Sequence, residues 1–234
     1  MATDTSAATR TDTPTLGYRT QLALIAALVA TLTIGVVLGF IGRGQINDGD
    51  TAPTPGTDQV EVGFAQDMSV HHSQAVEMSS MALSQAVDPA VRTLAYDVLT
   101  TQQSQIGTMH GWLVLWDQPT ISTQPAMSWM RGATTSMPGH SMPADGTMKM
   151  PGMATPEELT ALRRTIGPAF DSLYLQLLLR HHEGGLAMAR FARDNTTIPA
   201  VTALARQIDS AQTAETQTLR ELLDQRAVAP LPMN

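Results

Sequence analysis

The segment MSVHHSQAVEM at residues 68–78 returns later in the chain as LLRHHEGGLAM at residues 178–188. Both segments contain a His-His dipeptide, and His181 follows His71 by 110 residues. The same spacing relates Pro89-Ala-Val91 to Pro199-Ala-Val201 and Leu94-Ala95 to Leu204-Ala205, without a gap over about fifty residues. The chain therefore contains an internal duplication, and the repeated unit decides the fold.

Each copy of the repeat has the pattern of two helices joined by a short turn. Apolar and small side chains recur three or four residues apart, which is typical of a helix that packs in a bundle. Asp88-Pro89 supplies a helix N-cap and a first-turn proline, and Pro199 begins the matching helix in the second copy. The sequence thus predicts an all-α, ferritin-like four-helix bundle made of two repeated hairpins, residues 58–117 and 155–230.

The two hairpins are joined by residues 118–154, a segment rich in Met, Pro, Gly and Ser. It is too long for a simple connector, so we expect a mobile or functional Met-rich loop. Thr155-Pro-Glu-Glu158 is a capping signal, and it predicts a short lead-in helix before Gly167-Pro168.

The N-terminal region contains a long apolar segment, LALIAALVATLTIGVVLGFI at residues 22–41, without a charged side chain. This length is sufficient to span a bilayer, so residues 21–42 are predicted to form a transmembrane anchor. A cleaved signal peptide is the rival interpretation, but the sequence GFIGRGQ after the apolar run offers no small-x-small cleavage site. We expect a short cytoplasmic tail (residues 1–20), a single span of the cytoplasmic membrane and a Pro/Gly/Thr/Asp linker (residues 43–57) before an extracytoplasmic domain.

The composition of the 234-residue chain excludes several classes of function. The formal net charge is −7 and no basic run exists, so nucleic acid is not an expected partner. The absence of cysteine excludes disulfides, iron–sulfur clusters and thiolate zinc sites. The chain instead has 14 Met and six His, so a transition-metal site must use thioether, imidazole or carboxylate ligands.

The histidines of the repeat are the first candidate ligands. His71 and His181 fall within the apolar stripes of their helices, and His72 and His182 fall at the edge of those stripes. Counting back from each turn places Gln105 level with His71 and Glu215 level with His181, where a polar oxygen can accept the ring N–H. The candidate metal ligands in the repeat are His71, His72, His181, His182, Met68, Met78 and Met188, supported by Gln102, Gln105, Gln212 and Glu215. In the competing interpretation, the histidines of the apolar stripes only form hydrogen bonds and the Met side chains only fill the core.

The loop is a second candidate site. It places several thioethers and one imidazole close together in a polar segment: Met137, His140, Met142, Met148, Met150 and Met153. Such ligands suit soft monovalent copper, and thioethers do not lose their binding capacity in acid. A low-complexity linker that happens to be rich in Met is the alternative.

These motifs resemble a known family, the domain of unknown function 305. The first copy is similar to the family pattern at Met68-x-x-His71-His72-x-x-Ala75 and at Gln102-x-x-Gln105-Ile106-x-x-Met109-x-x-Trp112-Leu113, and the match covers roughly residues 60–226. The later copy carries Asp171, Tyr174, Leu175, His181, His182, Glu183 and Met188, and Pro151-Gly152-Met153 precedes the lead-in helix. The resemblance implies a ferritin-like helical fold and, for some members, an association with extracytoplasmic copper. Gln105 and Leu178 depart from the family's usual Glu and Met.

Copper binding or buffering at the outer face of the cytoplasmic membrane is the leading hypothesis, with Cu(I) as the expected ion and no catalytic residue identified. A non-catalytic structural or accessory envelope protein, whose histidines only bond within the core, is the alternative. A di-iron oxidoreductase would need two Glu-x-x-His motifs, and no Glu precedes a His by three residues. The sequence identifies no protein partner.

Overall fold

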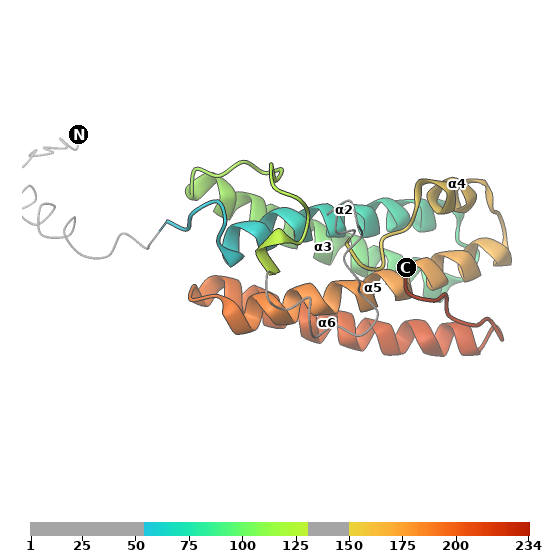
Figure 1. Ribbon diagram of the computed structural model, residues 1–234. Coiled ribbons are helices and arrows are strands. Elements are labelled where there is room, and N and C mark those ends of the chain that lie inside the picture. The colour runs from blue at the N-terminus through green and yellow to red at the C-terminus, as the bar shows by residue number, and fades with distance from the viewer. Residues whose placement is uncertain (1–53, 131–149) are drawn as a thin grey trace, which may run out of the picture. The chain divides into compact units, whose positions relative to one another are not determined.

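The structure, a computed structural model, describes residues 54–130 and 150–234, and within these ranges it contains helices and no strands. The α-helices are α2 (Val60–Gln85), α3 (Pro89–Leu115), α4 (Pro156–Arg164), α5 (Pro168–Asn195) and α6 (Pro199–Asp224), and a 3-10 helix, η1, spans Ser128–Met130. Figure 1 shows α2 and α3 as one long hairpin and α5 and α6 as another. The prediction of an all-α fold is confirmed for this part of the chain.

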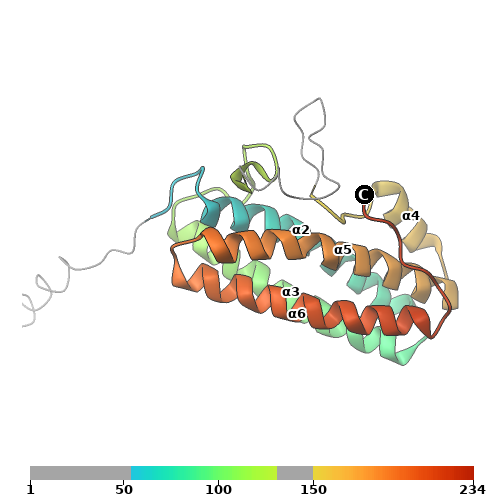
Figure 2. The ribbon, with the colours of Figure 1, turned by 60° about the horizontal axis from the view of Figure 1, so that its bottom comes forward.

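The two hairpins pack through α2 and α5, which run antiparallel to each other (Figure 2). A buried carboxylate at the start of each of these helices binds the turn of the other hairpin. Glu61 accepts hydrogen bonds from the Thr196 hydroxyl (2.6 Å) and the Thr197 amide (3.2 Å). Asp171 accepts from the backbone amides of Val87 (3.1 Å) and Asp88 (2.9 Å).

Glu61 and Asp171 are separated by the repeat spacing of 110 residues, so the duplication has become an approximate two-fold arrangement of hairpins. In each half, a side chain from one hairpin holds the turn of the other. The α2–α5 interface therefore has a fixed register at both ends.

The predicted helix caps are present. Asp88 is the N-cap of α3 and accepts from the Ala90 amide (2.8 Å). Thr155 caps α4 in a reciprocal capping box with Glu158 (3.2 and 2.8 Å). These bonds satisfy amides that the first turn of a helix leaves without partners, and they explain why α3 and α4 begin where they do.

The core of the bundle is divided into two hydrophobic clusters. One cluster gathers the end of α2, the starts of α3 and α5 and the end of α6, and includes Tyr174 and Leu177. The other gathers the start of α2, the end of α3, the end of α5 and the start of α6, and includes Phe64 and Leu113. Between them lies a layer of buried polar side chains, the His layer, formed by His71, His72, His181, His182, Gln102, Gln105 and Gln212 with the half-buried Glu215.

The two described ends of the 118–154 segment pack against the bundle. Trp129 in η1 is buried over α2 at Gly63, where a methyl group would lie 2.3 Å from the indole ring. The Trp129 Nε1 and the Met127 amide both donate to Asp67 (2.8 and 2.6 Å). At the other end, Pro151 and Gly152 are buried. The sequence pattern gave no sign of these contacts because they lie outside the repeat.

Several sequence predictions concern residues outside the described ranges. These are the cytoplasmic tail (1–20), the transmembrane anchor (21–42) and most of the linker (43–57), together with the loop residues Met137, His140, Met142 and Met148. Within residues 54–130 and 150–234, none of the helices combines the length and apolar character needed to cross a bilayer.

Candidate metal centre

Four fully buried histidines form the centre of the bundle. Helix α2 contributes His71 and His72, and α5 contributes His181 and His182, all with 0% exposure. The rings of His71 and His181 face each other across the α2–α5 interface, with centroids 3.8 Å apart and planes inclined by 32°. His72 and His182 lie farther out, with ring centroids 6.5 and 6.2 Å from those of their neighbours His71 and His181.

Each of the four rings makes one hydrogen bond, and in every case the ring atom is Nε2. The acceptors for His71, His72, His181 and His182 are the Pro151 carbonyl (3.2 Å), Gln105 Oε1 (2.8 Å), the His71 carbonyl (2.9 Å) and Glu215 Oε2 (2.5 Å). Because all four partners are oxygen acceptors, each neutral ring carries its proton on Nε2 and its lone pair on Nδ1. All four Nδ1 atoms are buried and have no hydrogen-bond partner among the described residues.

The partners of Gln105 and Glu215 differ from the sequence prediction. The register is as expected, but these side chains bond to His72 and His182 and not to His71 and His181. Neighbouring helical positions differ by about 100° in direction. His72 and His182 face the second helix of their own hairpin, whereas the other two face the opposite hairpin. The outer pair is thus buried within the hairpins and not placed at an edge.

Gln102 and Gln212 are also buried, at 3% and 2% exposure, and neither amide has a hydrogen-bond partner in the described part of the chain. A methyl group at Gly185 would lie 2.8 Å from Gln212 Oε1 and 3.1 Å from His71 Cε1, so this glycine leaves room for both side chains. The sequence placed these two glutamines in support of the histidines, but neither of them forms a hydrogen bond with an imidazole in this part of the chain. The amides instead line the His layer as unpaired polar groups.

Burial keeps the imidazoles of His71, His72 and His181 neutral. It lowers the pKa of His71 to about 4, against an opposing contribution from the Pro151 hydrogen bond, and lowers the pKa of His72 to about 3. Burial and the neighbouring His71 also hold the pKa of His181 well below its ordinary value. A histidine must be unprotonated to bind a metal, so these rings are available as ligands at neutral pH without losing a proton.

The thioethers are concentrated on one side of the His layer. Met68 and Met188 belong to the cluster at the η1 end. Three further methionines in that cluster, which sequence reasoning did not place in the site, are Met109, Met127 and Met130, all at most 2% exposed. Met109 follows the bundle stripe, but Met127 and Met130 come from outside the repeat, so no periodic signal identifies them.

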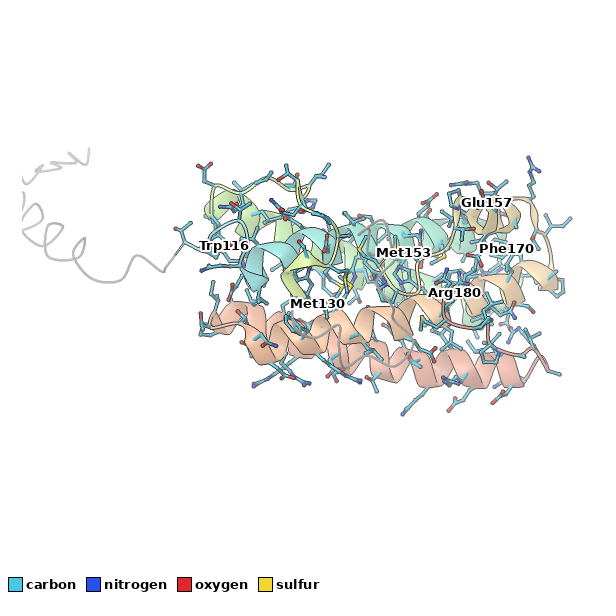
Figure 3. All side chains as sticks on the ribbon, in the orientation of Figure 1. Trp116, Met130, Met153, Glu157, Phe170 and Arg180 are labelled. Carbon is cyan, nitrogen blue, oxygen red and sulfur yellow. The ribbon has the colours of Figure 1, made fainter. Side chains whose placement is uncertain are left out.

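The remaining predicted methionines are distributed differently. Met78 lies in the opposite cluster. Met150 is half-buried against the η1-end cluster, and the Met153 carbonyl accepts a bond from Asn234 (3.0 Å). In Figure 3, Met153 and Arg180 lie near the middle of the bundle and Met130 lies nearer the end at which α2 begins.

The donor set fits a soft ion better than a hard one. No group of three or more His, Asp or Glu in the described residues is arranged to hold a metal ion, so nitrogen and oxygen ligands alone do not complete a site. Four imidazole lone pairs are nevertheless buried without partners. Each buried polar atom without a partner costs about 1–3 kcal/mol, which a bound ion would offset. Imidazole combined with thioether is the donor set that monovalent copper prefers.

The bundle and its buried layer define a class of protein: a duplicated helical hairpin that carries one His-His motif in each half. The chain belongs to the DUF305 family, whose model, described as a domain of unknown function, matches residues 61–223. The resemblance predicted from the His-His motifs is therefore confirmed.

Solved structures support the family assignment. A DUF305 protein from Streptomyces coelicolor, described as secreted, is 38% identical to this chain. The two structures match with a TM-score of 0.67, over 76% of this chain and 99% of that one. A DUF305 fragment from Deinococcus radiodurans is 29% identical, with a TM-score of 0.57 and coverage of 74% and 99%. CopM in its Cu(II)-bound form is 25% identical, with a TM-score of 0.52 and coverage of 71% and 97%. A comparison with curated proteins finds no match.

Proposed function

We propose that this protein binds or buffers Cu(I) in the His layer at the centre of its bundle. The observation that carries the proposal is the arrangement of the four buried imidazoles, each donating through Nε2 and each leaving Nδ1 without a partner. Metal-binding histidines commonly have this arrangement, because the bond from the second nitrogen fixes the tautomer and the orientation of the ring.

The chemistry of the neighbouring side chains supports copper as the ion. The chain has no cysteine, and buried thioethers lie in the core cluster that adjoins the layer. Thioether and imidazole together select Cu(I) over hard divalent ions. CopM, a protein with the same fold at 25% identity, is bound to Cu(II) in its solved structure, which supports copper as the metal.

His71, His72, His181 and His182 are the candidate ligands through Nδ1, with no more than two of them on one ion and with sulfur supplied by the methionines of the adjoining cluster. Met68 and Met188 are the thioethers predicted from the repeat, and Met109, Met127 and Met130 share their cluster. In this proposal the ion takes part in no catalytic reaction. The protein binds and releases it. The loop ligands Met137, His140, Met142 and Met148 stay a prediction.

The proposed place of action is the outer face of the cytoplasmic membrane. Residues 21–42 would anchor the chain, and the bundle would lie outside the cytoplasm. The secreted assignment of the Streptomyces coelicolor relative is consistent with an exported bundle. Protease added to spheroplasts should cleave the bundle while the N-terminal tail stays protected. Cleavage only after lysis would contradict the export of the bundle.

An accessory protein with purely structural histidines is the second candidate. The bond from His181 Nε2 to the His71 carbonyl favours it, because that bond joins the two hairpins without any metal. The two functions differ in one measurable respect. Structural histidines stabilise the bundle equally with and without copper.

The test is a titration of the full-length chain with Cu(I) against a competing chelator, followed by melting curves. A ligand at 100 times its dissociation constant stabilises the folded state by about 2.7 kcal/mol, so copper should raise the melting temperature. His181→Gln should abolish this rise, whereas His110→Gln, outside the layer on α3, should retain it. Equal behaviour of the two variants, or binding without any rise, would exclude the bundle site.

A further inference from the structure

The approximate two-fold symmetry of the bundle is broken beside the central histidines by the segment Pro151–Ala154, which we call the strap. Pro151 and Gly152 lie buried against α5, and Ala154 is joined to α2 by two hydrogen bonds. No equivalent segment follows from the repeat, because the strap belongs to the connection between the hairpins.

The strap changes the partner of one central histidine. His181 Nε2 donates to the carbonyl of His71 (2.9 Å), its counterpart across the interface. Symmetry would direct His71 Nε2 to the carbonyl of His181, but it donates to the Pro151 carbonyl instead (3.2 Å). The strap therefore determines which nitrogen of His71 carries the proton, and it leaves Nδ1 free.

Glycine at position 184 makes this contact geometrically available. A methyl group at Gly184 would lie 2.1 Å from the Pro151 carbonyl oxygen and 2.9 Å from the Gly152 nitrogen. Gly152 has a φ of +79°, and a methyl group there would lie 2.3 Å from the Arg180 carbonyl. Backbone therefore meets backbone at both positions, and no flexible side chain is available to move aside. This contact explains a glycine in mid-helix, where its conformational freedom is otherwise unfavourable.

The repeat places Gln74 in α2 where Gly184 stands in α5, and Gln74 also contacts the strap. Its amide accepts from the Ala154 nitrogen (2.6 Å) and donates to the Ala154 oxygen (2.9 Å). The two copies of the motif thus differ at the position that meets the strap. One copy makes room for the strap, and the other fixes it with a pair of hydrogen bonds.

We propose that Gly184 and Gln74 are positioning residues that seat the strap so that the Pro151 carbonyl holds His71 in its Nε2–H form. The effect on the ring is independent of metal. Its consequence for copper affinity rests on the proposed function, since only then does the free Nδ1 serve as a ligand.

Gly184→Ala is the direct test, with Gly107→Ala as the matched control because Gly107 lies in the interior of α3 with open space around its Cα. The first readout is the nitrogen NMR spectrum of the histidine side chains, recorded on the metal-free, full-length chain with isotopically labelled histidine. Gly184→Ala should remove the protonated-Nε2 pattern of His71 and leave those of His72 and His182 unchanged. An unaltered His71 pattern would overturn the proposal.

The second readout is Cu(I) affinity by chelator competition. Loss of an outer partner of a ligating histidine typically weakens metal binding roughly 10- to 100-fold, and this is the loss expected for Gly184→Ala but not for the control. Equal affinities would also overturn the proposal. If the unsubstituted chain binds no Cu(I), the proposed function fails, and the nitrogen spectrum alone decides the positioning role.

A second variant covers the case in which Gly184→Ala does not fold. Gln74→Leu removes both bonds to Ala154 without adding bulk to α5, and it should loosen the strap and shift the His71 nitrogen pattern in the same direction. A Gln74→Leu protein with the His71 pattern of the unsubstituted chain would contradict the role of the strap.

Discussion

Lowering the pH from about 7 to about 4.5 should destabilise the metal-free bundle strongly, because His71 and His72 are buried in their neutral forms. In the unfolded chain, histidine binds a proton below its ordinary pKa of 6.5. In the folded chain, the pKa is about 4 for His71 and about 3 for His72, so these rings stay unprotonated over most of that range. The unfolded state then holds more protons, so stability is fully present above pH 6.5 and falls as the pH falls toward the folded pKa values.

The size of the effect follows from the two pKa differences. Each histidine contributes a slope of about 1.4 kcal/mol per pH unit within the window, which amounts to roughly 2.5 kcal/mol between pH 6.5 and 4.5. The titration of His71 and His72 together therefore lowers the free energy of unfolding by roughly 5 kcal/mol, which is comparable to the whole stability of a marginal domain. Burial raises the pKa of Asp67, so this group acts in the opposite direction at the acidic end of the range.

Urea unfolding of the metal-free, full-length chain at a series of pH values measures this slope. His72→Gln removes one titrating ring, so the free energy of unfolding should fall less steeply with decreasing pH, by about 1.4 kcal/mol per unit. Gly107→Ala, which changes no titratable group and lies in open space on α3, should leave the slope unchanged. A stability that is flat between pH 6.5 and 4.5, or a His72→Gln protein with the full slope, would refute the reasoning.

Three further predictions follow from individual contacts. Gly63→Ala should force Trp129 off α2 and lower the free energy of unfolding by about 1–3 kcal/mol in denaturant melts. Gly107→Ala, the control with open space around it, should not lower it. Asp171→Ala leaves two backbone amides of the α2–α3 turn without their acceptor and should cost a similar 1–3 kcal/mol, so an unchanged melt would exclude its role. Gln105→Glu should raise the pKa of His72 by placing a carboxylate at its Nε2; an NMR titration that shows no rise would contradict this pairing.

The sequence was sufficient for the parts of the fold that repeat. The 110-residue spacing predicts two hairpins, and Asp88 and Thr155 mark helix starts that the structure confirms. These features are local or periodic, so they are visible in one dimension. The buried state of the stripe histidines His71 and His181 was predictable for the same reason.

The composition of the site was less predictable where it depends on helix rotation or on segments outside the repeat. A rotation of 100° decides whether Gln105 meets His71 or His72, and the stripe pattern alone does not determine it. The contacts of Trp129 and Pro151 join segments far apart in the chain, and these segments lie outside the repeat, so no periodic pattern indicates the contacts.

The most direct test of copper binding in the His layer is the Cu K-edge absorption fine structure of the Cu(I)-loaded, full-length chain. The account predicts a first shell that contains both imidazole nitrogen and thioether sulfur, with the nitrogen contribution reduced in His181→Gln. A shell of sulfur alone, unchanged in that variant, would place the ion among thioethers and contradict binding by histidines of the His layer.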